Sequence, residues 1–510
     1  MSDASLKHVV FVPAPSWGHL RPAIKTSLRM VEKFQDLFIS LFVYDSEVAK
    51  VTKYLNSQSS TYSIRIKVVT ASGNEATPTV PPANPVEIIG HLEKYFKSWI
   101  TRELQETTIS QVEDRSINKP SWIIEDLFNG GVSLACKDTH RLPIVSWWTT
   151  TAASLIRQVL CIAATASPLI GVLANKRGDI SFAEAGEIYL KELSNRLVCI
   201  PGIPAYHEWE LATQYFPFMP PLVARMIRRR ENMIKHVDAI ACCTTFEMEP
   251  ISATALSTAL SKPITSFFIG PAVDLVLPYQ PDLESPVTQF LDRAYSEKGN
   301  HSVVYAAFGT AFFPLPSSMP HLVTILDEIP KHGFRFIFAL PAARAKQLDQ
   351  SWMNAHIQAG NAIFPEWTNQ TEVLDHPAIH YFLSHGGWSS STEALVRGVP
   401  MILWPFVSDQ PSNSVQIATV HDCGFELLQV RTGPAKSTAY QNGMEVEIVG
   451  TDDSVHEEMK RILELSKGSK GAHQRMNAKL LGRVIGDSLA PGGSGDIGLE
   501  KFGKALGLVR

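Results

Sequence analysis

Short apolar runs alternate with helix-like patterns along the chain, and this alternation constrains the fold more than any other feature of the sequence. Ile24, Leu28 and Val31, for example, recur at the spacing that places apolar side chains on one face of a helix. Buried strands separated by such helices run parallel, because the crossover returns the chain to the same edge of the sheet. In the first half of the chain the apolar runs lie at residues 8–15, 37–43, 62–69, 122–125, 142–148, 239–244 and 264–269. The alternation predicts an α/β protein built on parallel sheets.

A proline-rich segment at residues 271–286 divides the alternation into two halves. It carries Pro271, Pro278, Pro281 and Pro286 and shows little periodicity, which is typical of a linker. Beyond it, apolar runs lie at residues 303–308, 334–340, 362–364, 379–383 and 400–404, with helix patterns at 317–329, 389–397 and 412–421. We therefore predict two Rossmann-like, doubly wound domains, which would leave a ligand-binding cleft between the carboxyl ends of their strands.

The predicted domains are residues 1–270 and residues 287–485. A tail at residues 486–510 follows, and its last helix could return to the first domain. A chain of 510 residues is too long for one compact domain, and no internal sequence repeat relates the two halves.

Charge and cysteine content exclude several classes of function. Lys and Arg total 46 against 50 Asp and Glu, with no long run of one sign, whereas nucleic-acid binders need a clustered basic excess. We therefore expect no nucleic-acid partner. The six cysteines form no CxxC pair and no metal-like Cys/His spacing, which is typical of reduced core thiols in a cytoplasmic protein. The N-terminal residues show no signal-peptide pattern.

Two long uncharged stretches, residues 299–326 and 158–175, test the chain for a membrane span. Prolines, glycines or polar residues interrupt both, so we predict no transmembrane segment, and a buried helix and loop at 158–175. Arg225 and residues 228–230 form a basic amphipathic patch, which is typical of a solvated helix face, with weak membrane-surface contact as the alternative. We expect the protein to be a monomer.

A glycine-rich turn in the second half joins an apolar run to a helix. Its sequence is Ser384-His385-Gly386-Gly387-Trp388, followed by Ser389-Ser390-Ser391-Thr392. Glycines let the backbone approach a ligand closely, and the N–H groups of a helix start favour an anion such as a phosphate. Neither G-K-[ST] nor G-x-G-x-x-G is present there, which excludes a P-loop and a dehydrogenase fingerprint. From these residues alone, a phosphate site and a tight turn capped by serines are equally good interpretations.

Residues 366–410 resemble the signature box of family 1 UDP-sugar glycosyltransferases, as found in plant secondary-product enzymes. The matching stretches are Glu366-Trp367-Thr-Asn-Gln370, His376-Pro-Ala, Phe382-Leu-Ser-His385-Gly-Gly-Trp388-Ser-Ser390-Ser-Thr-Glu393-Ala-Leu, Gly398-Val-Pro400 and Trp404-Pro-Phe-Val-Ser-Asp409-Gln410. Family-like segments elsewhere are Gly18-His19-Leu20, Glu125-Asp126-Leu-Phe128, Phe308-Gly309-Thr310 and Pro491-Gly-Gly-Ser494. The resemblance therefore covers most of the chain. It implies the GT-B fold, with an acceptor-binding domain first and a UDP-sugar-binding domain second.

The resemblance also implies which residues bind the donor. They are Gly18, Gly309, Thr310, Trp367, Gln370, His385, Gly387, Trp388, Ser389, Ser390, Glu393, Asp409 and Gln410. Trp367 would stack on uracil, since a planar ring suits another ring face. Gln370 and Glu393 would hold the ribose, because a carboxylate accepts hydrogen bonds from both hydroxyls of a diol.

The remaining box residues would hold the phosphates and the sugar. The resemblance assigns His385, Ser390 and Thr310 to the diphosphate. It assigns Asp409 and Gln410 to the sugar hydroxyls, and Gln410 is the residue that glucose-using relatives carry. Three positions depart from the family pattern, namely Ser389 in place of Asn, Gly386 in place of Cys and Thr310 in place of Ser. The contact normally made by that Asn is therefore in doubt.

His19 and Asp126 are the candidate catalytic pair of the first half. Each follows an apolar run, and in a doubly wound sheet both would face one crevice. A histidine oriented by a carboxylate acts as a general base. Taken singly, a Gly-His turn or an Asp at a strand end is more often structural, but the resemblance places the catalytic His and its partner Asp here. Strand alternation turns the neighbouring Glu125 to the opposite face.

Aromatic side chains near the pair suit an apolar acceptor pocket, although core packing explains many of them equally well. The candidate acceptor-binding residues are Trp17, Phe128, Trp147, Trp148 and Thr149. The resemblance implies inverting transfer of glucose from UDP-glucose to a hydroxyl of a small lipophilic or phenolic acceptor. Because the chain contains no Asp-x-Asp, we expect no metal and no cofactor besides the sugar nucleotide. The alternatives are another UDP-sugar, a sterol or lipid acceptor, an epimerase, or a catalytically silent UDP-sugar-binding protein.

Overall fold

The computed structural model divides the chain into two compact units. The first unit comprises residues 1–190, 218–272 and 487–510, and the second comprises residues 191–217 and 273–486. The structure describes residues 5–509 except 59, 71–84, 108–109, 159–179, 182–183, 187, 189–195, 217–218, 261–262, 277–281, 311 and 442. Most of the helix and loop predicted at 158–175 lies outside the described residues, as do Pro278 and Pro281 of the linker.

The first unit is built on a parallel sheet with the strand order β10-β9-β6-β5-β1-β2-β3, and the short β4 pairs antiparallel with β5. The strands are β1 Leu6–Val12, β2 Leu37–Phe42, β3 Ile66–Val69, β4 Gln111–Val112, β5 Arg115–Asp126, β6 Ile144–Trp148, β9 Ala239–Cys242 and β10 Thr265–Phe268. The direction of winding reverses between β1 and β5, which are direct neighbours with Val12 opposite Glu125. This is the position at which doubly wound sheets bind ligands.

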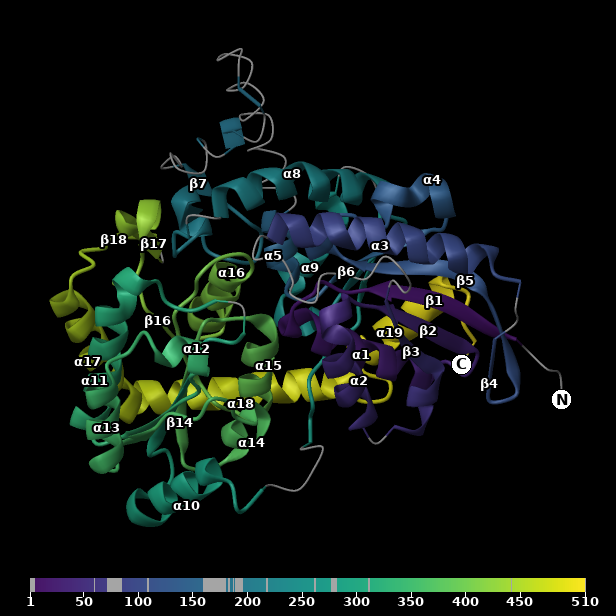
Figure 1. Ribbon diagram of the computed structural model, residues 1–510. Helices are drawn as coiled ribbons and strands as arrows, with labels where there is room; N and C mark the ends of the chain where they lie inside the picture. Colours follow the sequence, from purple (N-terminus) through teal and green to yellow (C-terminus); the bar gives the residue numbers. More distant parts are fainter. Residues whose placement is uncertain are drawn as a thin grey trace. The chain divides into compact units, whose positions relative to one another are not determined.

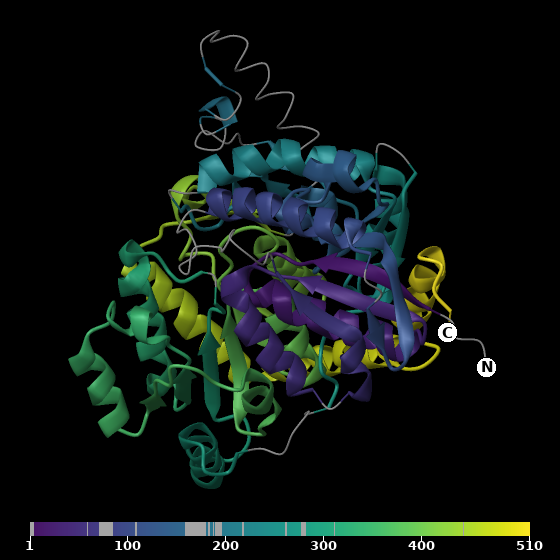
Figure 2. The same cartoon turned by 45° about the vertical axis from the view of Figure 1, so that its right-hand side comes forward.

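Helices cover both faces of this sheet (Figures 1 and 2). They are α1 Trp17–Lys33, α2 Val48–Asn56, α3 Pro85–Gln105, α4 Lys137–His140, α5 Ala152–Ile156, α8 Met219–His236, α9 Pro250–Ala259 and α19 Ser494–Ala505, with short 3₁₀ turns at Asp45–Glu47, Thr61–Arg65, Leu127–Asn129, Leu134–Cys136 and Phe246–Met248. In both views α3 and α8 lie on one side of the sheet. The core on the other side joins β1 and β2 to Ile24 and Val31 of α1 and to Phe502 of α19.

The second unit contains a parallel sheet with the strand order β13-β12-β11-β14-β15-β16. Its strands are β11 Val303–Ala307, β12 Arg335–Phe338, β13 Ala362–Ile363, β14 Ile379–Ser384, β15 Met401–Leu403 and β16 Gly424–Glu426. Two antiparallel pairs accompany the sheet, β7 Leu197–Val198 with β8 Tyr206–His207 and β17 Thr438–Gln441 with β18 Met444–Glu447. Here the winding reverses between β11 and β14.

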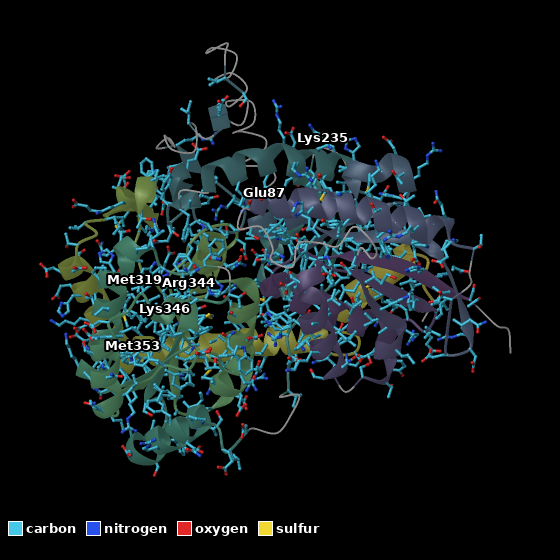
Figure 3. The ribbon with its side chains drawn as sticks, in the orientation of Figure 1. Glu87, Lys235, Met319, Arg344, Lys346 and Met353 are labelled. Carbon is cyan, nitrogen blue, oxygen red and sulfur yellow. The ribbon has the colours of Figure 1, made fainter. Side chains whose placement is uncertain are left out.

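Helices also surround this second sheet (Figure 1). They are α10 Pro286–Lys298, α11 Met319–Lys331, α12 Ala342–Ala345, α13 Gln350–Gln358, α14 Gln370–Asp375, α15 Trp388–Val396, α16 Gln410–Ser414, α17 Asp452–Lys467 and α18 Ser469–Leu489, with short turns at Glu208–Leu211, Pro316–Ser318 and Gly433–Lys436 and a π-helical segment at Val415–Val420. Figure 3 labels Met319 of α11, Arg344 of α12 and Met353 of α13.

The prediction of an α/β protein with two doubly wound parallel sheets is confirmed. The structure differs from the sequence-based boundaries in one place, since residues 191–217 belong to the second unit although they were predicted with the first domain. Residues 487–510 belong to the first unit. No helix among the described residues is both long enough and apolar enough to cross a membrane.

Candidate functional site

His19 and Asp126 meet at the reversal point of the first sheet. His19 lies in the first turn of α1, just after β1, and Asp126 is the last residue of β5. The distance from His19 Nδ1 to Asp126 Oδ2 is 2.7 Å. Asp126 is fully buried, whereas 18% of the His19 side chain is exposed. A carboxylate beside Nδ1 favours the tautomer that carries the proton there, which leaves the lone pair of Nε2 to accept one.

Two backbone N–H groups fix the carboxylate of Asp126. Ala14 donates to Oδ2 at 3.2 Å and Phe128 donates to Oδ1 at 2.9 Å, so both oxygens have defined partners. Glu125 points elsewhere, because its carboxylate accepts from the N–H groups of Val132 and Ser133. Burial raises the pKa of Glu125 to about 7. Asp126, rather than Glu125, is therefore the carboxylate that orients His19.

Phe128 is the aromatic residue in direct contact with this pair. Its ring meets the His19 imidazole edge-on, with 4.5 Å between ring centroids, and stacks on Trp148 at 5.0 Å. Trp148 is buried, and its indole N–H donates to the carbonyl oxygen of Thr151 at 2.8 Å. The guanidinium of Arg230 on α8 lies 5.1 Å from the centroid of Phe128. Phe128 thus joins His19 to an aromatic stack.

The other predicted acceptor residues are less directly connected to His19. Trp147 lies in the hydrophobic core against Phe11, so its side chain packs the sheet and is corrected from a contact residue to a core residue. Trp17 is half-buried and packs edge-on against Tyr54 of α2. Thr149 is buried directly after β6. Gly18 is exposed, and open space surrounds the position that a Cβ would occupy.

His385 lies at the reversal point of the second sheet, directly after β14. Two glycines cradle its ring. A Cβ on Gly309, which has φ +69°, would lie 2.9 Å from Cε1 and Nε2 of His385, and a Cβ on Gly387 would collide with Nε2. Gly309 follows β11, the neighbouring strand, and the next residue, Thr310, is exposed. The glycines of both turns are therefore needed for the imidazole to fit.

The environment keeps His385 uncharged in the absence of ligand. Burial lowers the pKa of His385 to about 4, and Nδ1 is buried without a hydrogen-bond partner among the described residues. A buried polar atom of this kind is normally satisfied, and here an external group could satisfy it. Helix α15 begins beside the ring with Gly387 as N-cap and no capping side chain. A neutral imidazole N–H and an uncapped helix start are together suited to an anion.

Ser389 and Ser390 are half-buried at the start of α15, while Trp388 and the next two hydroxyl residues, Ser391 and Thr392, are buried. Ser390 connects to the neighbouring helix α14, since its hydroxyl accepts from Gln370 Nε2 at 3.1 Å. The same nitrogen lies 2.7 Å from Glu393 Oε2. Ser389 occupies the position where the family pattern has Asn. Gln370, Ser390 and Glu393 form one polar cluster that two helices support.

Trp367 precedes this cluster and is 77% exposed. A large aromatic side chain that is exposed to this extent beside buried polar groups is available to stack on a planar ligand. Thr368, the next residue, is buried and bonds to the hydroxyl of Tyr305 at 2.7 Å, which anchors the loop below the indole.

Asp409 and Gln410 lie at the start of α16 and are held by separate partners. Asn413 donates its side-chain amide to Asp409 Oδ2 at 2.7 Å and to the carbonyl oxygen of Gly386 at 3.0 Å. Gln410 Oε1 accepts from the backbone N–H of Phe406 at 3.0 Å. Asn413, which ties Asp409 to the glycine turn, lies outside the motifs that the sequence offers. Its spacing of four from Asp409 on a helix was the available signal.

No cluster of three or more His, Cys, Asp or Glu side chains within the described part of the chain could hold a metal ion. The two sites therefore consist of an oriented histidine in the first unit and a polar, anion-compatible cluster in the second.

The chain is similar to known proteins in sequence and in fold. Residues 271–455 match the family model described as "UDP-glucoronosyl and UDP-glucosyl transferase". The chain is 26% identical over 441 residues to UDP-glycosyltransferase eriJ of Hericium erinaceus, covering 84% of each protein. It is 26% identical over 517 residues to UDP-glycosyltransferase 74C1 of Arabidopsis thaliana, covering 98% of this chain and 99% of that protein.

Among solved structures, Phytolacca americana UGT2 complexed with UDP-2fluoro-glucose and pterostilbene has a TM-score of 0.69 and 19% identity. The match covers 98% of this chain and 100% of that one. The fold is therefore GT-B, the class of two-domain glycosyltransferases. Residues 271–455 match that family model, and most of the chain is similar to named UDP-glycosyltransferases, so the protein is a glycosyltransferase.

Proposed function

We propose that this enzyme transfers glucose from UDP-glucose to a hydroxyl group of a small lipophilic or phenolic acceptor, with inversion at the anomeric carbon. The observation that carries the proposal is the 2.7 Å contact between His19 Nδ1 and Asp126 Oδ2, beside the stacked rings of Phe128 and Trp148. Pterostilbene and UDP-2fluoro-glucose in the Phytolacca americana complex are consistent with acceptors and donors of these classes.

In the proposed mechanism His19 is the general base. Its Nε2 removes the proton of the acceptor hydroxyl as the oxygen attacks the anomeric carbon from the face opposite the diphosphate. Asp126 keeps the proton on Nδ1 and stabilises the imidazolium that forms. One bond forms as another breaks, so the anomeric configuration inverts and UDP leaves.

The leaving diphosphate gains negative charge, which the second unit is suited to stabilise. The start of α15, the imidazole of His385 and the hydroxyl of Ser390 are the proposed donors, together with Thr310. The sequence contains no Asp-x-Asp with which to bind a metal on the diphosphate. We therefore propose metal-independent transfer, with Trp367 stacked on uracil and Gln370 and Glu393 at the ribose.

The proposed glucose preference rests on the two residues at the start of α16. Gln410 Oε1 is occupied by backbone N–H groups, so its amide nitrogen is left to donate. Asp409 can only accept when ionised. One donor and one acceptor match two adjacent hydroxyls, whereas an epimer leaves a polar group unpaired at a cost of about 1–3 kcal/mol.

A UDP-release assay with and without acceptors tests this function. Release from UDP-glucose should require an acceptor from a panel of phenols, sterols and lipid alcohols, should withstand EDTA, and should yield a β-linked product by NMR. Donor turnover without an acceptor would indicate an epimerase, and UDP binding without turnover would indicate a silent binding protein. A higher rate with UDP-galactose or UDP-glucuronate would refute the glucose preference, and a sterol preference would move the acceptor class to lipids.

We further propose a monomer that works in the cytoplasm. Cys136, Cys242, Cys243 and Cys423 are buried free thiols and Cys199 is an exposed one, which suits a reducing compartment. Sedimentation analysis and localisation of a tagged protein test these two points.

A further inference from the structure

Residues 206–216, here called the strap, form a buried segment of the second unit although their sequence lies within the first half of the chain. The strap consists of β8, the 3₁₀ turn Glu208–Leu211 and residues 212–216. Glu210, Thr213 and Gln214 are buried polar residues. Buried polar side chains require specific partners. Glu210 has one local partner, the N–H of His207, and the strap's other partners described below lie about 190 to 230 residues further along the chain.

An ion-pair network anchors the first part of the strap. Glu210 Oε2 lies 2.6 Å from Arg431 Nη1, and Arg431 Nη2 lies 2.8 Å from Glu426 Oε1. Glu210 Oε1 also accepts from the backbone N–H of Tyr440 at 2.9 Å. Because Arg431 is buried between two carboxylates, its pKa is raised. Removing one partner would leave an uncompensated buried charge.

The second part of the strap holds the loop that leads to Asp409 and Gln410. The hydroxyl of Thr213 donates to the carbonyl oxygen of Pro405 at 2.6 Å. The backbone N–H of Gln214 donates to the carbonyl oxygen of Phe406 at 3.0 Å. Gln214 Nε2 donates to the carbonyl oxygen of Val430 at 2.7 Å. The peptide groups of residues 405–406 are therefore fixed by a segment about 190 residues earlier in the sequence.

The same loop sets the orientation of Gln410. The N–H groups of Phe406 and Val407 donate to Gln410 Oε1 at 3.0 and 3.4 Å. Only the oxygen of the amide can accept two such bonds, so this contact decides which way the amide faces. A chain of hydrogen bonds thus runs from Thr213 through residues 405–407 to Gln410.

We propose that the strap is a positioning element for donor-sugar selection, and that Thr213 acts on the sugar through the peptide groups of residues 405–407 and the side chain of Gln410. This inference rests on the proposed function, because Gln410 is the proposed sugar contact. The strap does not touch the sugar. It determines whether the amide of Gln410 is presented to one hydroxyl in one orientation or samples several.

The test compares Thr213→Val, which removes the hydroxyl at similar shape, with Thr213→Ser, which keeps it. The ratio of kcat/KM for UDP-glucose to that for UDP-galactose should fall about tenfold in Thr213→Val and recover in Thr213→Ser. The affinity for UDP, which lacks the sugar, should not change by calorimetry. Ser466→Ala serves as the matched control, because it also removes a buried hydroxyl that donates to a carbonyl oxygen, at 2.7 Å on α17. It should lower stability without changing the ratio.

Hydrogen exchange separates failure of this inference from failure of the proposed function. Amide exchange at residues 406–410 should accelerate in Thr213→Val and not in Ser466→Ala, whichever donor the enzyme uses. Accelerated exchange with a protein that transfers no glucose would refute the proposed function and leave the strap as a loop-positioning element. Unchanged exchange, an unchanged donor ratio, or equal losses of UDP and UDP-glucose affinity would overturn the inference.

Discussion

Asp126 uses both carboxylate oxygens to fix its surroundings, one on the N–H of Phe128 and the other on His19 and Ala14. The imidazole consequently has one orientation and one favoured tautomer before any substrate binds. Preorganisation of this kind avoids rearrangement during the reaction. At the scale of single residues, the pair of His19 and Asp126 therefore requires these two side chains in this geometry.

Replacing His19 with Ala should lower kcat by about 10²–10⁴-fold, because a placed general base contributes about that factor. UDP affinity should change little, since the proposed nucleotide site lies in the second unit. Asp126→Asn should also lose activity, because an amide facing Nδ1 favours the wrong tautomer. Steady-state kinetics with an alcohol acceptor and calorimetry with UDP measure both effects.

The double variant His19→Ala/Asp126→Asn provides the control for this prediction. Residues that act as a unit are not additive, so it should be little worse than His19→Ala alone. Near-normal turnover of an alcohol by His19→Ala would refute the mechanism, although the protein would still be similar to UDP-glycosyltransferases.

The glycine cradle of His385 gives a second prediction for single residues. Gly387→Ala should displace the imidazole and weaken UDP binding about tenfold, but it should cost little more once His385 is already Ala. Gly309→Ala is the matched control. It should remain harmful in the His385→Ala background, since its φ of +69° strains any residue with a Cβ by about 1–2 kcal/mol. Calorimetry completes this cycle, and additive losses for Gly387 and His385 would contradict it.

At the scale of elements, the apolar runs predicted the parallel strands of both sheets except β16, and they did not predict the antiparallel strands β4, β7, β8, β17 and β18. β16 has three residues and begins with Gly424, whose missing Cβ leaves room for the backbone of Met401. The run at 62–69 was only half a strand. Its first part is a 3₁₀ turn, because Arg65 points back and donates to carbonyl oxygens at the end of α1, among them that of Val31. Such long-range bonds leave no local pattern.

The same division applies to the sites. Spacing and resemblance pointed to His19, Asp126 and the turn around His385, because each lies at or just after the end of a strand at a reversal point of its sheet. Their roles stay predictions. Spacing and resemblance left Trp147 open between core packing and an acceptor contact, and the structure places it in the core, because both faces of a central strand are buried. Neither spacing nor resemblance revealed the strap, whose partners depend on tertiary contacts between segments about 190 residues apart.

Helix α5 offers a pH-dependent prediction at this scale. The carboxylate of Glu249 accepts from the N–H groups of Ala152 and Ala153 at its start, and burial raises the pKa of Glu249 from 4.5 to about 7. Between these values the folded protein holds a proton that the unfolded chain has lost. The free energy of unfolding therefore falls as pH rises through this window, by at most about 3 kcal/mol for this group.

Glu249→Gln cannot titrate, so its stability relative to the parent protein should improve between pH 5 and pH 8. Urea unfolding at both values measures the difference. Glu87→Gln, at an exposed carboxylate on α3 labelled in Figure 3, is the control. Its free energy of unfolding relative to the parent protein should be the same at pH 5 and pH 8. An advantage for Glu249→Gln that shrinks with rising pH would show that the hydrogen bonds, rather than burial, dominate.

For the whole molecule, the two units should respond differently to damage and to ligand. Phe502 of α19 is buried in the core of the first unit beside Phe267, and Phe502→Ala should cost about 3–5 kcal/mol there. UDP affinity at low denaturant should persist. Phe336→Ala, in β12 of the second unit, should instead destabilise the second unit and lower UDP affinity at low denaturant, and it should leave the stability of the first unit unchanged.

Denaturant unfolding followed by exchange mass spectrometry resolves the two units. UDP at one hundred times its dissociation constant should stabilise the second unit by about 2.7 kcal/mol. Equal stabilisation of both units in every variant would show that they unfold as one cooperative body.

The path of the chain also affects how related enzymes can recombine. The polypeptide passes from one unit to the other after residues 190, 217, 272 and 486. A recombination event at the proline-rich linker would therefore combine the strap of one parent with residues 405–410 and Arg431 of the other. Exchange of donor preference between relatives should succeed more often when residues 191–217 travel with residues 273–486. The eleven residues of the strap precede the linker in sequence although they belong to the second unit. We therefore expect them to limit recombination between relatives at the linker.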